Sequence, residues 1–232
     1  MVGMGAYHEL DVLCRGRINS MTGYLINIRE IDEAVRLHAL PVFQRAHRAP
    51  VAQDPPEVLQ AALEALRKPL DGLLASLRWR MTPYYCLTMH EESTDRLILR
   101  QQFEFAASHR LHCATLSDQE NQALFGKCNR GSGHGHNYRL EPAVVVPWKA
   151  EVPARAFNVG HLESIVDESI IRRFDHTHLN LDVPEFADLN PSVENIAKVC
   201  FELLAPPISA AGALLKSVTV WETDKTSCTY PG

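Results

Sequence analysis

The fold of this chain is predicted from one glycine-framed stretch, residues 133–140, which reads GHGHNYRL. It aligns without a gap with residues 3–10 (GMGAYHEL). Two further pairs follow in the same order, 25–28 (LINI) with 156–159 (AFNV) and 76–79 (SLRW) with 217–220 (SVTV). We interpret this pattern as a tandem duplication, in which the second copy is complete and the first lacks its opening strand.

The apolar pattern predicts a second copy with elements in the order β-β-α-α-β-β. Alternating apolar residues predict strands over 96–107 and 135–146. Apolar residues three and four positions apart predict helices over 161–173 and 192–204. Two short strands, over 216–222 and 226–230, close the copy. The expected fold class is therefore α+β.

The same signals predict a shorter first copy. Its elements are a strand over 7–17, helices over 29–40 and 57–70, and strands over 74–81 and 84–89. Residues 91–95 are the expected linker between the copies. We therefore divide the chain into a degenerate unit, 1–92, which we expect to be structural, and a complete catalytic unit, 93–232.

The composition is that of an ordinary globular protein and excludes some function classes. Of 232 residues, 46% are hydrophobic, and 23 Lys+Arg against 28 Asp+Glu give a formal net charge of −5. A nucleic-acid binder would normally be basic. The apolar runs are a few residues long, whereas a membrane-spanning helix needs about 20. The first residues lack the apolar run of a secretory signal, and six scattered cysteines favour reduced thiols. We expect a cytoplasmic protein that binds neither nucleic acid nor membrane.

The histidines of residues 133–140 are candidate metal ligands. His134 and His136 are two positions apart, so on a strand both imidazoles point to the same face. His109 has the same parity as Phe103 and Phe105, and it meets the other two histidines if the predicted strands pair. Three histidines with an open fourth position describe a catalytic zinc site. The alternative is surface decoration, because the chain has 11 histidines.

Two other segments carry candidate catalytic residues. Cys128 lies in a loop rich in Gly, Ser and Asn, where Lys127 and Arg130 would favour the thiolate. Asp175 precedes His176, and a neighbouring carboxylate can orient an imidazole and raise its basicity. The alternatives are a buried, inert cysteine and a simple helix-terminating loop.

A candidate binding residue lies on the penultimate predicted strand. Glu222 is isolated among apolar residues, so it needs a partner. A planar pair of donors, such as a guanidinium or an aminopyrimidinone edge, would satisfy the carboxylate with two hydrogen bonds. The alternative is that Glu222 faces solvent.

Together these segments resemble the 6-pyruvoyl-tetrahydropterin synthase family, which also holds the bacterial 6-carboxytetrahydropterin synthases of queuosine and deazapurine synthesis. The matching segments keep the family's order and are 105–111, 126–138, 174–176 with 179–180, 191–197 and 221–223. The resemblance implies the tunnelling fold, in which each unit is an antiparallel four-stranded sheet backed by two helices. Such units associate side by side into a barrel around a tunnel. It also implies 7,8-dihydroneopterin triphosphate as the substrate.

Position by position, the resemblance also implies site residues. The zinc ligands are His109, His134 and His136, the catalytic residues are Cys128, Asp175 and His176, Glu222 anchors the pterin, and Ser192 and Glu194 lie in a segment that lines the pterin pocket. Val193 stands where some members carry a second Thr. Five residues separate Cys128 from His134, as in the pyruvoyl-forming synthases. Among the basic residues, Lys127, Arg130 and Arg110 could meet the triphosphate.

The first copy lacks these groups, and this predicts one zinc site per chain. Met4 and Ala6 align with the two histidines of the second copy, and Met81 aligns with Glu222. Open sheet edges invite pairing, so we expect a homo-oligomer in which a neighbouring unit completes the Cys128 site. Three alternatives remain: a related pterin or GTP hydrolase, a pterin-binding protein without turnover, and a metal-binding module for transport or storage.

Overall fold

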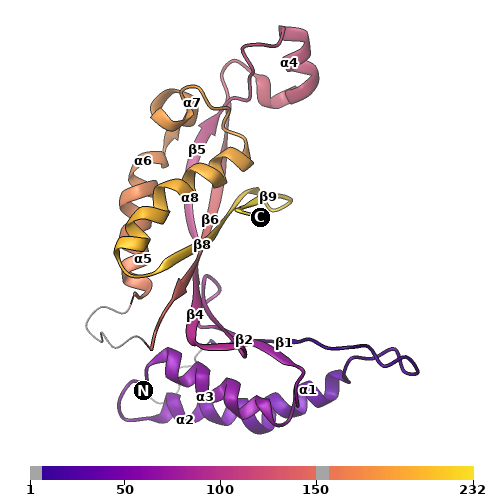
Figure 1. Ribbon diagram of the computed structural model, residues 1–232. Coiled ribbons are helices and arrows are strands. Elements are labelled where there is room, and N and C mark those ends of the chain that lie inside the picture. Colours follow the sequence, from indigo (N-terminus) through magenta and orange to yellow (C-terminus); the bar gives the residue numbers. More distant parts are fainter. Residues whose placement is uncertain (1–6, 150–156) are drawn as a thin grey trace. The chain divides into compact units, whose positions relative to one another are not determined.

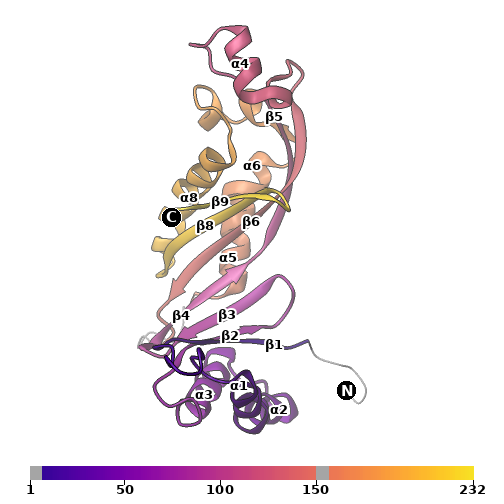
Figure 2. The ribbon, with the colours of Figure 1, turned by 90° about the vertical axis from the view of Figure 1, so that its right-hand side faces the viewer.

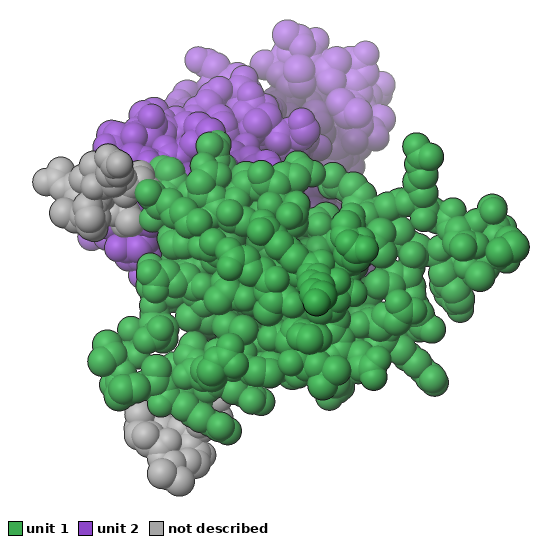
Figure 3. Space-filling view, turned by 60° about the horizontal axis from the view of Figure 1, so that its bottom comes forward, with its two compact units in different colours: residues 1–99, 146–153 green, residues 100–145, 154–232 purple. Residues whose placement is uncertain are grey.

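The computed structural model describes residues 7–149 and 157–232, and these form two compact units. Unit 1 comprises 1–99 and 146–153, and unit 2 comprises 100–145 and 154–232 (Figure 3). The units therefore divide after Leu99, later in the chain than the expected linker at 91–95. Only a two-residue turn, Glu91 and Glu92, separates β3 (Tyr85–His90) from β4 (Ser93–Gln101), because these strands are neighbours in one sheet.

Unit 1 is a small antiparallel sheet with helices on one face (Figures 1 and 2). β1 (Glu9–Cys14) pairs with β2 (Leu74–Arg80), and β2 pairs with β3. Between β1 and β2 the chain forms α1 (Ile28–Ala34), a π-helical turn (Val35–Ala39), α2 (Leu40–Arg48) and α3 (Pro55–Arg67). These elements follow the order predicted for the first copy.

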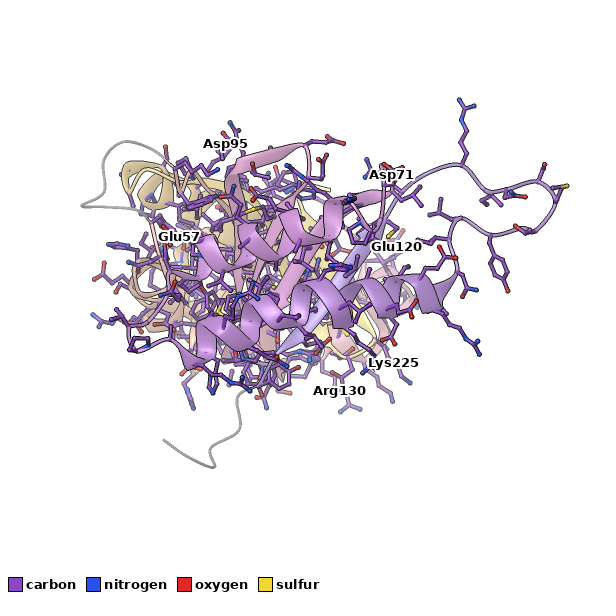
Figure 4. All side chains as sticks on the ribbon, turned by 90° about the horizontal axis from the view of Figure 1, so that it is seen from below. Glu57, Asp71, Asp95, Glu120, Arg130 and Lys225 are labelled. Atoms are coloured by element: carbon purple, nitrogen blue, oxygen red, sulfur yellow. The ribbon has the colours of Figure 1, made fainter. Side chains whose placement is uncertain are left out.

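Helix α3 shows why the sequence of unit 1 folds in this way. Leu59, Leu63 and Leu66 recur at helical spacing and are all fully buried. Pro55 and Pro56 occupy the first turn, where a missing N–H leaves no bond unmade. Figure 4 labels Glu57 in that first turn and Asp71 in the turn that leads to β2. The polar side chains lie on the other side of α3, so its apolar face packs into the core.

Unit 2 has the antiparallel sheet that the second copy predicts. β5 (Phe103–His109), β6 (His134–Val146), β8 (Leu214–Thr223) and β9 (Thr226–Tyr230) pair in that order, and the short β7 (Thr177–His178) runs parallel to β5. One helical segment joins α5 (Val159–Val166), a π-helical turn (Asp167–Ile171) and α6 (Arg172–Phe174). It lies with α8 (Val193–Ala210) on one face of the sheet (Figures 1 and 2). α4 (Asp118–Phe125) and α7 (Leu179–Asp182) lie in the connections. None of the described helices has the length and apolar composition that crossing a bilayer requires.

The strand predicted over 96–107 is two strands, β4 and β5, which are divided at Gln102. Leu97, Ile98 and Leu99 are buried at consecutive positions, so burial does not alternate in this stretch and the strand is covered on both faces. True alternation begins at Phe103 and runs to His109. The other predicted elements of the second copy are found with shifted ends; α8, for example, continues to Ala210.

Candidate metal centre and active site

Three histidines meet on the helix-covered face of the unit 2 sheet. His109 on β5 is directly opposite His134 on β6, and Ala107 is opposite His136. The ligand nitrogens of the three histidines all lie within 4.8 Å of one another, and the Nε2 atoms of His109 and His134 are 3.2 Å apart. The small side chain of Ala107 leaves room for the ring of His136. The register of one strand pair thus brings together residues 25 positions apart.

A hydrogen bond fixes the ring of His109. Its Nδ1–H donates to the carbonyl oxygen of Pro191, at 2.7 Å, so Nε2 carries the lone pair and faces the other two histidines. His109 is fully buried, and burial lowers its pKa to about 4. Burial and the neighbouring His136 also lower the pKa of His134. The lowered pKa values of His109 and His134 favour the neutral imidazole, which is the form that binds metals.

The polar atoms of this cluster fit a divalent cation. Among the described residues, Nε2 of His136 and Nδ1 of His134 are buried without a hydrogen-bond partner. Oε1 of Glu222, on β8, lies 3.3 Å from Nε2 of His109 and 3.6 Å from Nε2 of His136. Imidazole nitrogens that converge beside a carboxylate, with Nε2 of His136 buried and unpartnered among them, are a donor set that suits zinc.

Cys128 lies in a turn close to the segment that follows β5. It belongs to a 3₁₀ turn, Gly126–Asn129, and its carbonyl oxygen accepts a hydrogen bond from the N–H of Leu111 at 2.9 Å. Its side chain is half-buried. Arg110 is fixed to the same turn, because its guanidinium donates to the carbonyl and the side-chain oxygen of Asn129. Arg110 is thus less available for a triphosphate than Lys127 and Arg130, which are exposed (Figure 4 labels Arg130).

Asp175 and His176 form a hydrogen-bonded pair at the outer edge of β5. Oδ1 of Asp175 accepts from the N–H of Ala106 at 2.7 Å, and Oδ2 accepts from Nδ1 of His176 at 2.8 Å. These two hydrogen bonds lower the pKa of Asp175. The backbone of His176 has a φ of 59°, a strained conformation for a residue other than glycine that is typical of functional sites. The hydrogen bond from Nδ1 to Asp175 therefore fixes the orientation of the imidazole.

The Asp175–His176 pair is not brought together with Cys128. The side chain of His176 is 83% exposed, and it lines a hollow of about 540 Å³ with Ala106 and Asn137. The side chains of Ala106 and Asn137 alternate with those of Ala107 and His136, which point to the face of the metal cluster, and Ala107 and His136 also border this hollow. Within residues 7–149 and 157–232, no hydrogen bond or ion pair joins His176 to Cys128.

The two remaining predicted residues lie at the start of α8. Ser192 is the N-cap of this helix, and its hydroxyl accepts a hydrogen bond from the N–H of Asn195. Glu194 is exposed in the first turn. The contact between this segment and the histidines is made by the backbone of Pro191, which sequence reasoning did not identify.

Tyr138 is a further site residue that sequence reasoning missed. It follows His134 and His136 at the same spacing of two, and it is fully buried against the rings of His109 and His136. Its hydroxyl has no hydrogen-bond partner in the part of the chain that the structure describes. The period-two pattern could have identified it.

Comparison with known proteins finds relatives that match the second part of the chain. The model of the 6-pyruvoyl tetrahydropterin synthase family matches residues 98–232, which is more than half of the chain. The 6-pyruvoyl tetrahydrobiopterin synthase of Homo sapiens is 42% identical over 135 residues, which are 57% of this chain and 89% of the human protein. The Dictyostelium discoideum protein of the same name is 32% identical and is covered over 96% of its length. The solved structure of Caenorhabditis elegans 6-pyruvoyl tetrahydropterin synthase superposes with a TM-score of 0.54 and 33% identity, over 59% of this chain and 96% of that one.

Proposed function

The chain belongs to the 6-pyruvoyl tetrahydropterin synthase family and is an enzyme of that type, and on this premise we propose that it is a zinc-dependent lyase acting on 7,8-dihydroneopterin triphosphate. The observation that carries the proposal is the convergence of His109, His134 and His136, whose ligand nitrogens lie within 4.8 Å of one another. The reaction eliminates triphosphate and gives 6-pyruvoyl-tetrahydropterin, which accords with the names of the relatives.

Zinc held by the three histidines would supply a Lewis acid that lowers the pKa of the substrate's side-chain hydroxyls. The chain's own residues then position the substrate and move its protons. The Cys128 thiolate accepts a carbon-bound proton, and His176, oriented by Asp175, returns a proton on the other face. The Glu222 carboxylate accepts two hydrogen bonds from the edge of the pterin ring. The exposed Lys127 and Arg130 attract the triphosphate.

We also propose that the enzyme is a homo-oligomer with shared sites. The exposure of His176 at the sheet edge supports this, because an oriented imidazole whose side chain is 83% exposed is available to a neighbouring chain. In this arrangement the Asp175–His176 pair of one chain completes the site around Cys128 of a neighbouring chain. The open edge of β9 provides a surface for the association.

The proposal that unit 1 is a degenerate copy has independent structural support. The sequence alignments relate Leu10 to Leu140 and Trp79 to Val220, and Leu10 pairs with Trp79 just as Leu140 pairs with Val220. Asn27 and Asn158, which also align, each cap the helix that follows. Both helices continue into a π-helical turn, Val35–Ala39 and Asp167–Ile171. Met4 and Ala6 lie outside the described residues, so the loss of the metal site rests on the sequence.

Incubation with 7,8-dihydroneopterin triphosphate and magnesium tests this function. We expect release of triphosphate and a product with the mass of 6-pyruvoyl-tetrahydropterin. Release of acetaldehyde would instead assign the carboxy-forming reaction, and opening of the ring would assign a hydrolase. Tight binding of the substrate without turnover would overturn the enzyme assignment.

A further inference from the structure

The buried hydroxyl of Tyr138 is a donor without an acceptor. Its ring stacks on Phe105, with centroids 5.1 Å apart and planes 19° apart, and its centroid lies 5.5 Å from that of His136. Tyr138 is fully buried, and no described residue is a hydrogen-bond partner of its hydroxyl. An unpartnered buried hydroxyl is unfavourable. The hydroxyl therefore requires an acceptor in the working site.

The strand register points to Glu222. β6 and β8 pair Leu140 with Val220 and Arg139 with Trp221. One further step of this register sets Glu222 opposite Tyr138, and opposite residues of antiparallel strands share a face with Cβ atoms about 5 Å apart. Leu140 and Val220 are both buried, so this is the inner face of the sheet. Burial, and then the charges of Glu222 and Cys128, raise the pKa of Tyr138, which therefore stays a donor.

Glu222 has two competing uses in this site. Its Oε1 lies 3.3 Å from Nε2 of His109 and 3.6 Å from Nε2 of His136, the atoms that would bind zinc. Carboxylate oxygens are themselves zinc ligands. An unrestrained Glu222 could therefore close the fourth position of the metal and lose its place as an anchor for the pterin ring.

We propose that the Tyr138 hydroxyl donates a hydrogen bond to the Glu222 carboxylate when the three histidines bind metal, and so keeps Glu222 off the metal. This inference rests on the proposed function for its metal and for the role of Glu222. It makes Tyr138 a positioning residue, which acts on the substrate site through Glu222.

Cobalt-substituted protein gives a direct test, because its visible absorption reports what occupies the fourth position. Azide is titrated into the wild type, Tyr138→Phe, the double variant Tyr138→Phe/Glu222→Gln and the control Tyr230→Phe, whose ring contacts Phe201. We expect azide affinity to fall about tenfold or more in Tyr138→Phe, the equilibrium effect of one hydrogen bond to a charged group. The double variant should regain the wild-type affinity, and the control should keep it.

Equal azide affinity in the wild type and Tyr138→Phe would overturn the inference, as would a loss that the double variant does not restore. Tyr138→Phe removes one oxygen that has no partner in the described structure, so the core packing is kept. The titration uses no pterin, so its result stands even if the protein fails to convert 7,8-dihydroneopterin triphosphate. Failure of the wild type to bind cobalt would overturn both the metal centre and this inference.

Discussion

At the residue scale, the metal cluster depends on side chains that the β5–β6 register and one carbonyl hold in place. His134 is opposite His109 and shares its strand face with His136. Loss of a residue that hydrogen-bonds to a metal ligand lowers metal affinity by about 10–100-fold, so loss of the ligand itself should lower the affinity further. We expect His134→Ala to lose zinc and turnover together, as measured by metal analysis and triphosphate release. His38→Ala, a change at an exposed histidine of unit 1, should keep both. Stoichiometric zinc in His134→Ala would contradict this assignment.

The thiol of Cys128 should affect turnover without affecting the metal. Cys128 is half-buried, and its backbone carbonyl oxygen accepts a hydrogen bond from the N–H of Leu111. A substitution of the side chain leaves this bond in place. We expect Cys128→Ala to keep zinc and its unfolding midpoint while turnover falls by about 10²–10⁴-fold, the usual contribution of one proton-transfer group. Cys14→Ala, a change at another half-buried cysteine, is the control. Full activity in Cys128→Ala would make this cysteine a structural residue.

Side-chain spacing made the cluster of three histidines predictable from the sequence, whereas the contacts that support the cluster were not predictable. Because side chains alternate along a strand, His134 and His136 point to one face of the sheet. His109 points to the same face as Phe103 and Phe105 on the neighbouring strand. The carbonyl of Pro191 could not be found in this way, because a backbone oxygen carries no residue signature and lies 82 positions from His109. The tertiary fold alone brings them together.

At the scale of elements, the loop that leads into β6 depends on a glycine. Gly133 has a φ of +68°, and a Cβ there would lie 2.8 Å from the carbonyl oxygen of His109 and 2.9 Å from Nε2 of His178. We expect Gly133→Ala to lower the free energy of unfolding by about 1–3 kcal/mol. The substitution combines backbone strain at a positive φ with a steric clash of the new Cβ. Urea unfolding measures this change.

Gly131 provides the matched control in the same loop. A Cβ at Gly131 would meet nothing within 4 Å, and its φ lies outside the left-handed range. Gly131→Ala should therefore change stability by less than about 0.5 kcal/mol. Equal effects of the two substitutions would show that the backbone of Gly133 imposes no special requirement.

The types and order of the elements followed from periodicity, but the division of the strand over 96–107 did not. Leu97, Ile98 and Leu99 are buried together, and a strand covered on both faces has no alternation that would mark its end. The helical segment from α5 to α6 was predicted as one helix over 161–173. Its π-helical turn, Asp167–Ile171, has no composition signal that a sequence pattern detects.

At the scale of the whole molecule, the proposed shared site predicts complementation between inactive variants. Cys128→Ala and His176→Ala each remove one group, and in a shared site the two groups come from different chains of the oligomer. Mixed oligomers should therefore contain some sites with both groups intact. After co-refolding in equal amounts, we expect up to about a quarter of the wild-type turnover. No recovery in demonstrably mixed oligomers would assign both groups to one chain.

The sequence identified the Asp175–His176 pair but could not show which site it serves. A motif gives the residue types, whereas the sheet face to which these side chains point depends on the pairing of β7 with the edge of β5. Likewise, the sequence patterns predicted the order of elements in each unit, while the boundary after Leu99 followed from the packing of β4 in unit 1.

We propose that each chain carries one zinc site, in unit 2, on which lyase turnover depends. Stepwise return of zinc to metal-free protein tests it most directly, with triphosphate release from 7,8-dihydroneopterin triphosphate measured at each step. Since the described residues contain one cluster of metal-binding geometry, His109, His134 and His136, we predict that turnover rises linearly and stops at one zinc per chain. Full turnover without metal, or a rise that continues to two zinc per chain, would contradict a single catalytic zinc site in unit 2.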